Sequence, residues 1–179
     1  PREFAFDASY SMKLSQTFSM GVTGRFIHSN LSGHVTNSST NTDTRPANSI
    51  SADVSAYYNN DLTLGGYNAN LAFGANISNM GPKVTYSNQN EKDFIPTNIR
   101  LGTALTTEFD PYNKLTFAFD INKLLVPSPA LGDSIGNLGV NATNEQGWVA
   151  GMFGSFADAP DGMSEELKEI TFATGVEYW

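Results

Sequence analysis

The sequence predicts an all-β protein: an antiparallel transmembrane β-barrel, present here as an incomplete barrel of about seven long strands with one short helix near 163–169. Three observations favour this fold class. Apolar and polar residues alternate with a period of two in seven separate segments. These segments reach about 9–13 residues, whereas strands average roughly 5–6 residues in soluble proteins and tilted membrane strands need about 9–11. Short turns also alternate with long polar connections, as in outer-membrane barrels.

The first alternating segment, Glu3–Leu14, illustrates the pattern. Its even positions are apolar, whereas its odd positions include Asp7 and Lys13. Successive side chains of a strand point to opposite faces, so one face suits lipid or packed protein and the other suits a water-filled lumen. The same alternation recurs in residues 18–26, 50–58, 71–78, 98–109, 115–122 and 170–178.

The connections between these segments alternate in length. Ser15–Thr17 is predicted to be a tight turn. Residues 110–114 are predicted to form another, in which Pro111 presets the backbone and Phe109 lies opposite Leu115. Long loops are expected at residues 30–48, 88–96 and 127–163.

We expect one domain, a partial β-barrel over residues 1–179. Ser164 followed by Glu165 and Glu166 predicts the capped start of the short helix. Pro1 and Trp179 both adjoin strand patterns. The chain is therefore expected to be a fragment that lacks N-terminal and C-terminal strands, because only helices and closed barrels satisfy their backbone hydrogen bonds in hydrocarbon.

Composition narrows the function classes. The net charge of −8 argues against nucleic acid as a partner, since phosphates need Lys and Arg. The absence of cysteine excludes a disulfide framework and a thiolate metal site. No run approaches the roughly 18–20 apolar residues of a spanning helix, and a barrel would escape that test because only alternate residues face lipid.

Five segments carry a family resemblance. Two are long and specific: "DFIPTNIRLGTALTTEFDPYNKLTFAFDINKLLVP" (93–127) and "GMFGSFADAPDGMSEELKEI" (151–170). Three are shorter: "GRFIHSNL" (24–31), "ANISNMGPKVTYS" (75–87) and "GVEYW" (175–179). Together they resemble the PorV (LptO) family, outer-membrane barrels of the Bacteroidetes type IX secretion system. The "IPTNIRLG" segment is similar to strand entries across the wider FadL-like superfamily.

The resemblance implies a fourteen-stranded barrel in the bacterial outer membrane that is not an enzyme. It implies a component of type IX secretion that binds cargo C-terminal signal domains at the translocon and shuttles them to the sortase attachment complex at the surface. Outer-membrane lipid would then be a further partner. Two alternatives stay open: a FadL-type outer-membrane channel for hydrophobic small molecules, and a soluble β-sandwich binding module.

Residues suited to catalysis are few. The only histidines are His28 and His34, and no serine lies in a GxSxG motif. A metal site on the two histidines would need help from a carboxylate such as Asp43, and solvated histidines are the simpler interpretation. We therefore predict no catalytic, cofactor-binding or metal-binding residues.

Charged residues on the predicted polar face are candidates for a lumen. The functional interpretation is a lumen that steers ions or a ligand, and the simpler one is a wet interior whose opposite charges pair. The lumen-facing candidates are Asp7, Arg25, Asp53, Arg100, Glu108 and Asp120.

Apolar residues in the longest loop are candidates for partner contact. Trp148, Met152, Phe153 and Phe156 lie where a solvated loop should be polar. They are interpreted as a plug for the barrel mouth, a contact for a partner protein, or a small amphipathic helix lying on the barrel. Tyr178 and Trp179, at a strand end, are predicted to lie at the membrane interface, where an apolar ring and a polar tip find different solvents.

Overall fold

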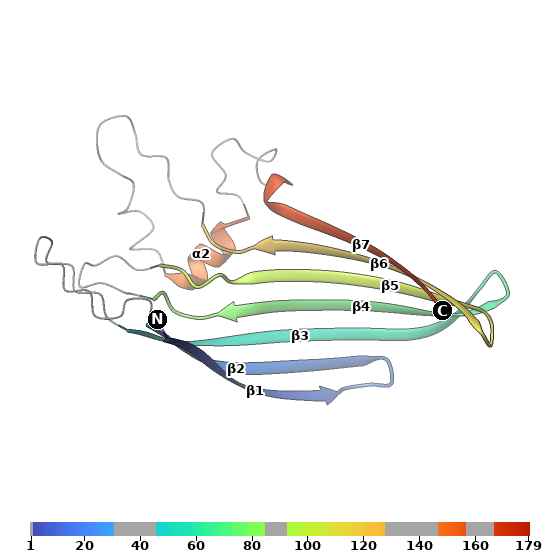
Figure 1. The fold of residues 1–179 in the computed structure, drawn as a ribbon, viewed down its shortest axis with the longest axis horizontal. Coiled ribbons are helices and arrows are strands. Elements are labelled where there is room, and N and C mark those ends of the chain that lie inside the picture. Colours follow the sequence, from blue (N-terminus) through green and yellow to red (C-terminus); the bar gives the residue numbers. More distant parts are fainter. Residues whose placement is uncertain (1, 31–45, 85–92, 128–146, 157–166) are drawn as a thin grey trace, which may run out of the picture.

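The fold is a single antiparallel sheet whose strands follow chain order. The computed structural model describes residues 2–30, 46–84, 93–127, 147–156 and 167–179. Each strand pairs only with its neighbours in sequence, in the order β1-β2-β3-β4-β5-β6-β7 (Figure 1). The strands are β1 (Arg2–Lys13), β2 (Phe18–Asn30), β3 (Ala47–Leu64), β4 (Tyr67–Met80), β5 (Asn98–Asp110), β6 (Asn113–Leu124) and β7 (Ile170–Tyr178).

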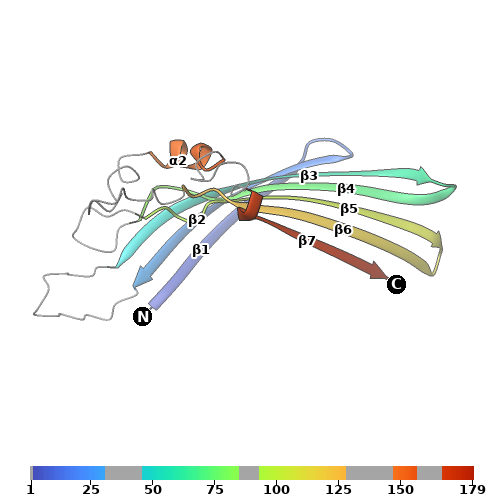
Figure 2. The same ribbon diagram turned by 90° about the horizontal axis from the view of Figure 1, so that it is seen from above.

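The sheet is twisted and curved, and its two ends differ (Figure 2). The tight connections β1–β2, β3–β4 and β5–β6 lie together at one end, here called the turn end. The opposite end, called the loop end, holds the last residues of β2, β4 and β6, the first residues of β1, β3, β5 and β7, and the helix α2 (Trp148–Gly154), whereas β7 ends at the turn end (Figure 1). The predicted all-β, antiparallel fold is confirmed, and the open curved sheet is consistent with an incomplete barrel.

The cross-strand register separates two kinds of residue onto two faces. One row that crosses all seven strands is apolar throughout and defines the apolar face: Met12, Met20, Ala56, Ala75, Leu101, Ile121 and Phe172. The adjacent row points the other way and defines the polar face: Ser11, Gly21, Ser55, Asn76, Arg100, Asn122 and Thr171. The period of two in the sequence is thus continuous across the sheet.

Exposure on the two faces is the reverse of that in a soluble sandwich. Phe6 is 69% exposed and Phe117 is 53% exposed. Along β2 the apolar Met20, Val22 and Phe26 are exposed, while polar-face residues are half-buried. Burying such side chains normally contributes about 1.5–3 kcal/mol each, so a face that leaves them open in the free sheet needs an apolar surrounding.

Two of the tight turns differ from what the sequence pattern indicated. Gly65 and Gly66, which lie outside the alternating segments named above, form the two-residue β3–β4 turn, and their φ values of 60° and 90° suit glycine. Phe109 does not lie opposite Leu115: Leu115 pairs with Thr107, and the register shifts between Glu108 and Asp110. The cause is a tighter turn, in which the Asp110 carboxylate accepts hydrogen bonds from the Tyr112 backbone (2.8 Å) and the Asn113 amide (2.7 Å).

Only part of the predicted helix lies within the described residues. Of the helix expected near 163–169, residues 163–166 lie outside the described residues, and Leu167–Glu169 form a 3-10 turn. Within the described residues, an α-helix is found at α2 (Trp148–Gly154), in the segment expected to be a loop. None of the helices in the described part of the chain has the length and apolar character needed to cross a bilayer.

Candidate functional site

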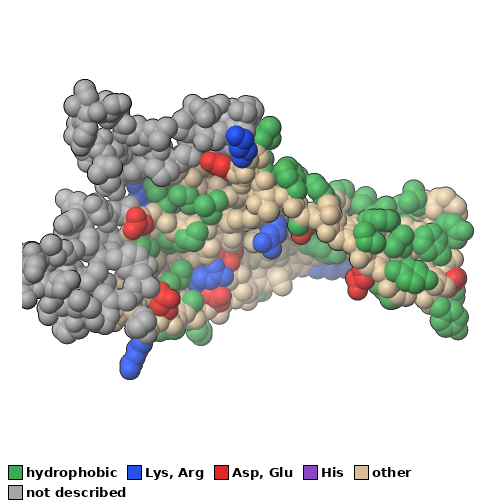
Figure 3. Space-filling model, turned by 45° about the horizontal axis from the view of Figure 1, so that its top comes forward, with side chains coloured by type: hydrophobic (Ala, Val, Ile, Leu, Met, Phe, Trp, Pro, Cys, Tyr) green, Lys and Arg blue, Asp and Glu red, His purple; other side chains and the backbone are tan. Residues whose placement is uncertain are grey.

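The candidate site is the polar face of the sheet, together with the loop end. All six predicted lumen-facing residues lie on this face, because the register aligns their strands with the same parity: Asp7, Arg25, Asp53, Arg100, Glu108 and Asp120. Whether the face lines a lumen stays a prediction. A space-filling view shows charges of both signs interspersed along the sheet, with hydrophobic side chains gathered at the turn end (Figure 3).

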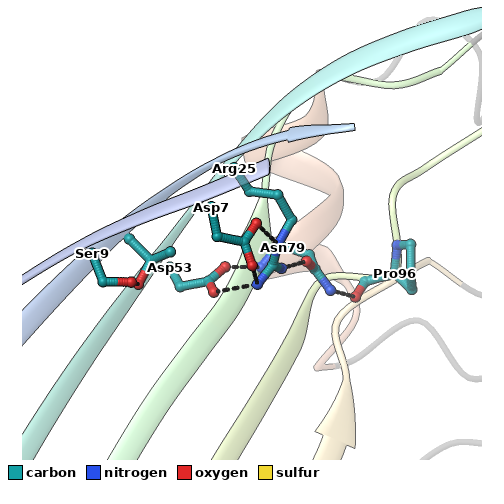
Figure 4. Close-up of polar contacts among 7 residues, drawn as sticks. Asp7, Ser9, Arg25, Asp53, Asn79 and Pro96 are labelled. Atoms are coloured by element: carbon teal, nitrogen blue, oxygen red, sulfur yellow. Dashed lines mark hydrogen bonds and ion pairs between the residues drawn. The ribbon is translucent and has the colours of Figure 1, made fainter. Parts of the chain in front are cut away.

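Arg25 joins four successive strands near the loop end (Figure 4). Its guanidinium donates to Asp7 on β1 (Nε–Oδ1, 2.8 Å), to Asp53 on β3 (3.2 Å) and to the side-chain oxygen of Asn79 on β4. The carboxylate of Asp53 also accepts the backbone N–H of Asn79 at 2.8 Å. We call Asp7, Arg25, Asp53 and Asn79 the Arg25 cluster. Side chains from four neighbouring strands thus meet at one point on the polar face.

The Arg25 cluster contains one residue that the sequence pattern did not indicate. Asn79 lies where the β3–β4 register shifts, between the pairs Ala52–Met80 and Val54–Ile77, and its φ is 58°. The extra residue is a β-bulge, which turns the Asn79 side chain toward Arg25. Asn79 also contacts the next loop, donating to the Pro96 carbonyl at 3.2 Å and accepting from Thr97 Oγ1 at 2.8 Å.

The turn end of the polar face is lined by amides, hydroxyls and carboxylates. Asn59 and Asn70 exchange side-chain hydrogen bonds at 2.9 and 2.8 Å, and Asn70 also donates to Asp61. Lys114 forms an ion pair with Glu108, one of the predicted lumen-facing residues. These groups border an open cavity of about 460 Å³ lined by Asp61, Leu62, Thr63, Asn68, Ala69, Asn70, Thr106 and Glu108.

At the loop end, α2 presents apolar side chains outward. Of the four residues predicted to contact a partner, Trp148, Phe153 and Phe156 are exposed, whereas Met152 is buried. The helix packs closely against the segment before β5, since a Cβ on Gly151 would lie 2.6 Å from the Phe94 ring. Residues 148–154 therefore form a short helix, which was one of the three interpretations of this segment. Contact with a partner protein stays a prediction.

An ion pair between a buried lysine and a half-buried glutamate near the loop end was not predicted. Lys123 shares a row with Ile77, Ile99 and Ile170 on the apolar face, yet its side chain is only 6% exposed. Its ammonium lies 2.7 Å from Glu169. Lys123 and Glu169 are 46 positions apart in the sequence, so the alternation within one strand could not predict that they pair.

Tyr178 and Trp179, the two residues predicted to lie at the membrane interface, point to opposite faces of the sheet. Tyr178 pairs with Leu115 on the apolar face at the turn end, and its hydroxyl donates to Asn113. Trp179 exchanges backbone hydrogen bonds with Lys114 and so follows the polar face. Tyr67 and Phe109 stack edge to face at this same end, with centroids 5.3 Å apart. Placement at a membrane interface stays a prediction.

Among the described residues, no group of three or more His, Asp or Glu side chains is placed to hold a metal ion. His28 hydrogen-bonds Asn48 and stacks on Phe4. His34 and Asp43 lie outside the described residues.

The comparison with protein families decides the assignment. The model of the family described as "Type IX secretion system protein PorV" matches residues 1–131, which is most of the chain. The chain belongs to the PorV family. No curated protein matched the sequence. The chain is thereby a component of the type IX secretion system, and the family match covers the 93–127 block that carries the resemblance, whereas the 151–170 and 175–179 blocks lie beyond it.

Proposed function

We propose that the chain is part of an outer-membrane β-barrel that carries cargo during type IX secretion. The observation that supports this most is the pair of faces in a PorV-family sheet, apolar on one side and polar on the other. The apolar face would meet lipid and the polar face would line a lumen, the arrangement that lets β-strands cross a bilayer.

We propose further that recognition lies at the loop end. Loops held by a rigid sheet are the usual place for binding residues. Trp148, Phe153 and Phe156 offer exposed apolar surface there, of the kind that marks protein contacts. Their partners would be the translocon, the cargo C-terminal signal domain and the sortase attachment complex. The chain would act by binding and not by catalysis.

A FadL-type channel for hydrophobic small molecules is the alternative. Such a channel would need an apolar path, but the polar face holds the Arg25 cluster and the Lys114–Glu108 pair. An apolar ligand would displace water from these charged groups, and that desolvation costs free energy even for paired charges. This arrangement favours the secretion role.

The test is affinity purification of the tagged protein from detergent-solubilised membranes, followed by mass spectrometry. The translocon and cargo with C-terminal signal domains should accompany it. Recovery without either of these would favour the channel.

The Phe153→Ser variant tests the loop end. Phe153 is 66% exposed, so the change should leave the fold intact and reduce recovered partners by about tenfold, the effect of about 1.4 kcal/mol of lost contact. Tyr112→Ser removes an aromatic ring that is 87% exposed at the turn end and serves as the matched control. Equal recovery with both variants would contradict recognition at the loop end.

A further inference from the structure

A second hollow lies on the polar face, across the middle of β3, β4, β5 and β6. It measures about 320 Å³, within the lower range of small-molecule sites. Gly74 and Gly102 are paired in its floor, and Tyr57, Arg100 and Asp120 contribute to its lining. The hollow exists because two adjacent strands carry no side chain at its centre.

The two glycines have different roles. A Cβ on Gly102 would lie 2.4 Å from Asp120 Oδ1, so the missing side chain makes room for the carboxylate. A Cβ on Gly74 would meet no atom within 4 Å. The space above Gly74 is therefore open, and a larger residue would enter it without a clash.

The charges at the hollow are not paired with each other or with any other described residue. Arg100 lies opposite Asn122 and Asp120 lies opposite Gly102, so the two charges are diagonal neighbours on one face. The neighbouring Arg25 contrasts with them, since Asp7 and Asp53 satisfy it. The side-chain oxygen of Asn122, on the same row as Arg100, is buried without a hydrogen-bond partner.

We propose that this hollow binds a small zwitterion, a molecule with a carboxylate beside an ammonium group, as in a free amino acid. Arg100 would hold the carboxylate through paired N–H donors, and Asp120 would accept from the ammonium. The Tyr57 ring offers an apolar wall for the body of the ligand. The site goes beyond the proposed function, because neither lipid contact nor partner binding at the loop end uses it.

Three related small molecules test the contributions of Arg100 and Asp120 separately. Calorimetry on the protein purified from membranes in detergent would compare L-phenylalanine with 3-phenylpropionate, which lacks the amine, and 2-phenylethylamine, which lacks the carboxylate. L-phenylalanine should bind at least tenfold more tightly than either analogue. Equal binding of an analogue, or no binding of L-phenylalanine, would overturn the proposal.

Variants locate the site. Arg100→Gln and Asp120→Asn should each weaken L-phenylalanine binding about tenfold, and Gly74→Val should abolish binding by filling the hollow. Lys13→Gln removes a positive charge from the same face at the sheet edge and should leave the affinity unchanged. Retained binding in Gly74→Val would overturn the proposal, as would equal losses in Lys13→Gln and Arg100→Gln. Partner recovery should be normal in all four variants, so this inference and the secretion role fail separately.

Discussion

At the scale of single residues, Arg25 stabilises the sheet through its neighbours. Its side chain is 23% exposed and that of Asp53 is 15% exposed, so removing the guanidinium leaves a half-buried carboxylate without its counter-charge. We expect Arg25→Gln to lower the free energy of unfolding by about 1–2 kcal/mol, below the cost for fully buried pairs because solvent screens the site. Urea unfolding of the protein in lipid vesicles would measure it.

Arg100→Gln is the matched control for this prediction. Arg100 lies on the same face and pairs with no described residue, so its loss should change the free energy of unfolding by less than about 0.5 kcal/mol. Equal destabilisation by both changes would mean that charge on the polar face, and not the Arg25 cluster, determines the effect.

Alternation alone predicts which residues share a face, but not which of them meet. Asp7, Arg25 and Asp53 could be assigned to one face because each occupies the polar phase of its strand. Their convergence on Asn79 depends on the bulge in β4 and on a positive φ. A single extra residue in one strand leaves the period of the flanking segments intact, so the sequence pattern did not reveal it.

At the scale of elements, the β3–β4 turn tests why β3 is so long. The strand continues to Leu64 because Gly65 and Gly66 can adopt positive φ and reverse the chain in two residues. Gly66→Val should cost about 1–3 kcal/mol of unfolding free energy, since a β-branched residue is strained at φ 90°. Thermal or urea unfolding in vesicles would measure the loss.

Gly65→Asn provides the comparison, because Asn accepts left-handed backbone conformations and is common in such turns. It should cost less than half as much as Gly66→Val. If the two variants were equally stable, backbone conformation would not limit this turn.

The strands were more predictable than the connections for a physical reason. Each strand alternates apolar and polar residues along 9–18 positions, so a long strand gives a strong periodic pattern in the sequence. The turn at Asp110 depends on two hydrogen bonds that the Asp110 carboxylate accepts, and α2 is a helix of only 7 residues. The turn is set by individual contacts that leave no period in the sequence, and so short a helix depends on packing against residues distant in sequence, here Phe94.

At the scale of the whole molecule, the two faces determine the environment that the sheet requires. The described residues include few large buried apolar side chains: among hydrophobic residues, Ala47, Ala69, Ile95, Leu125 and Met152 are the buried ones. Cohesion within the sheet comes from its backbone ladder and from polar-face clusters. Burial of the apolar face must therefore come from the surroundings, which in the proposed function are lipid.

Two adjacent positions in β6 test this directly. Phe117 lies on the apolar face and Ala118 on the polar face, where it pairs with Ala104 and Gly175. Phe117→Arg should cost about 2–4 kcal/mol of stability in vesicles, because it places a charge against hydrocarbon. Ala118→Arg adds the same side chain one residue away, above small neighbours on the wet side, and should cost under about 1 kcal/mol. The ratio of folded to unfolded protein across a urea series would compare the two variants. A larger loss in Ala118→Arg than in Phe117→Arg would mean that lipid covers the other face, and the proposed orientation of the sheet would then be reversed.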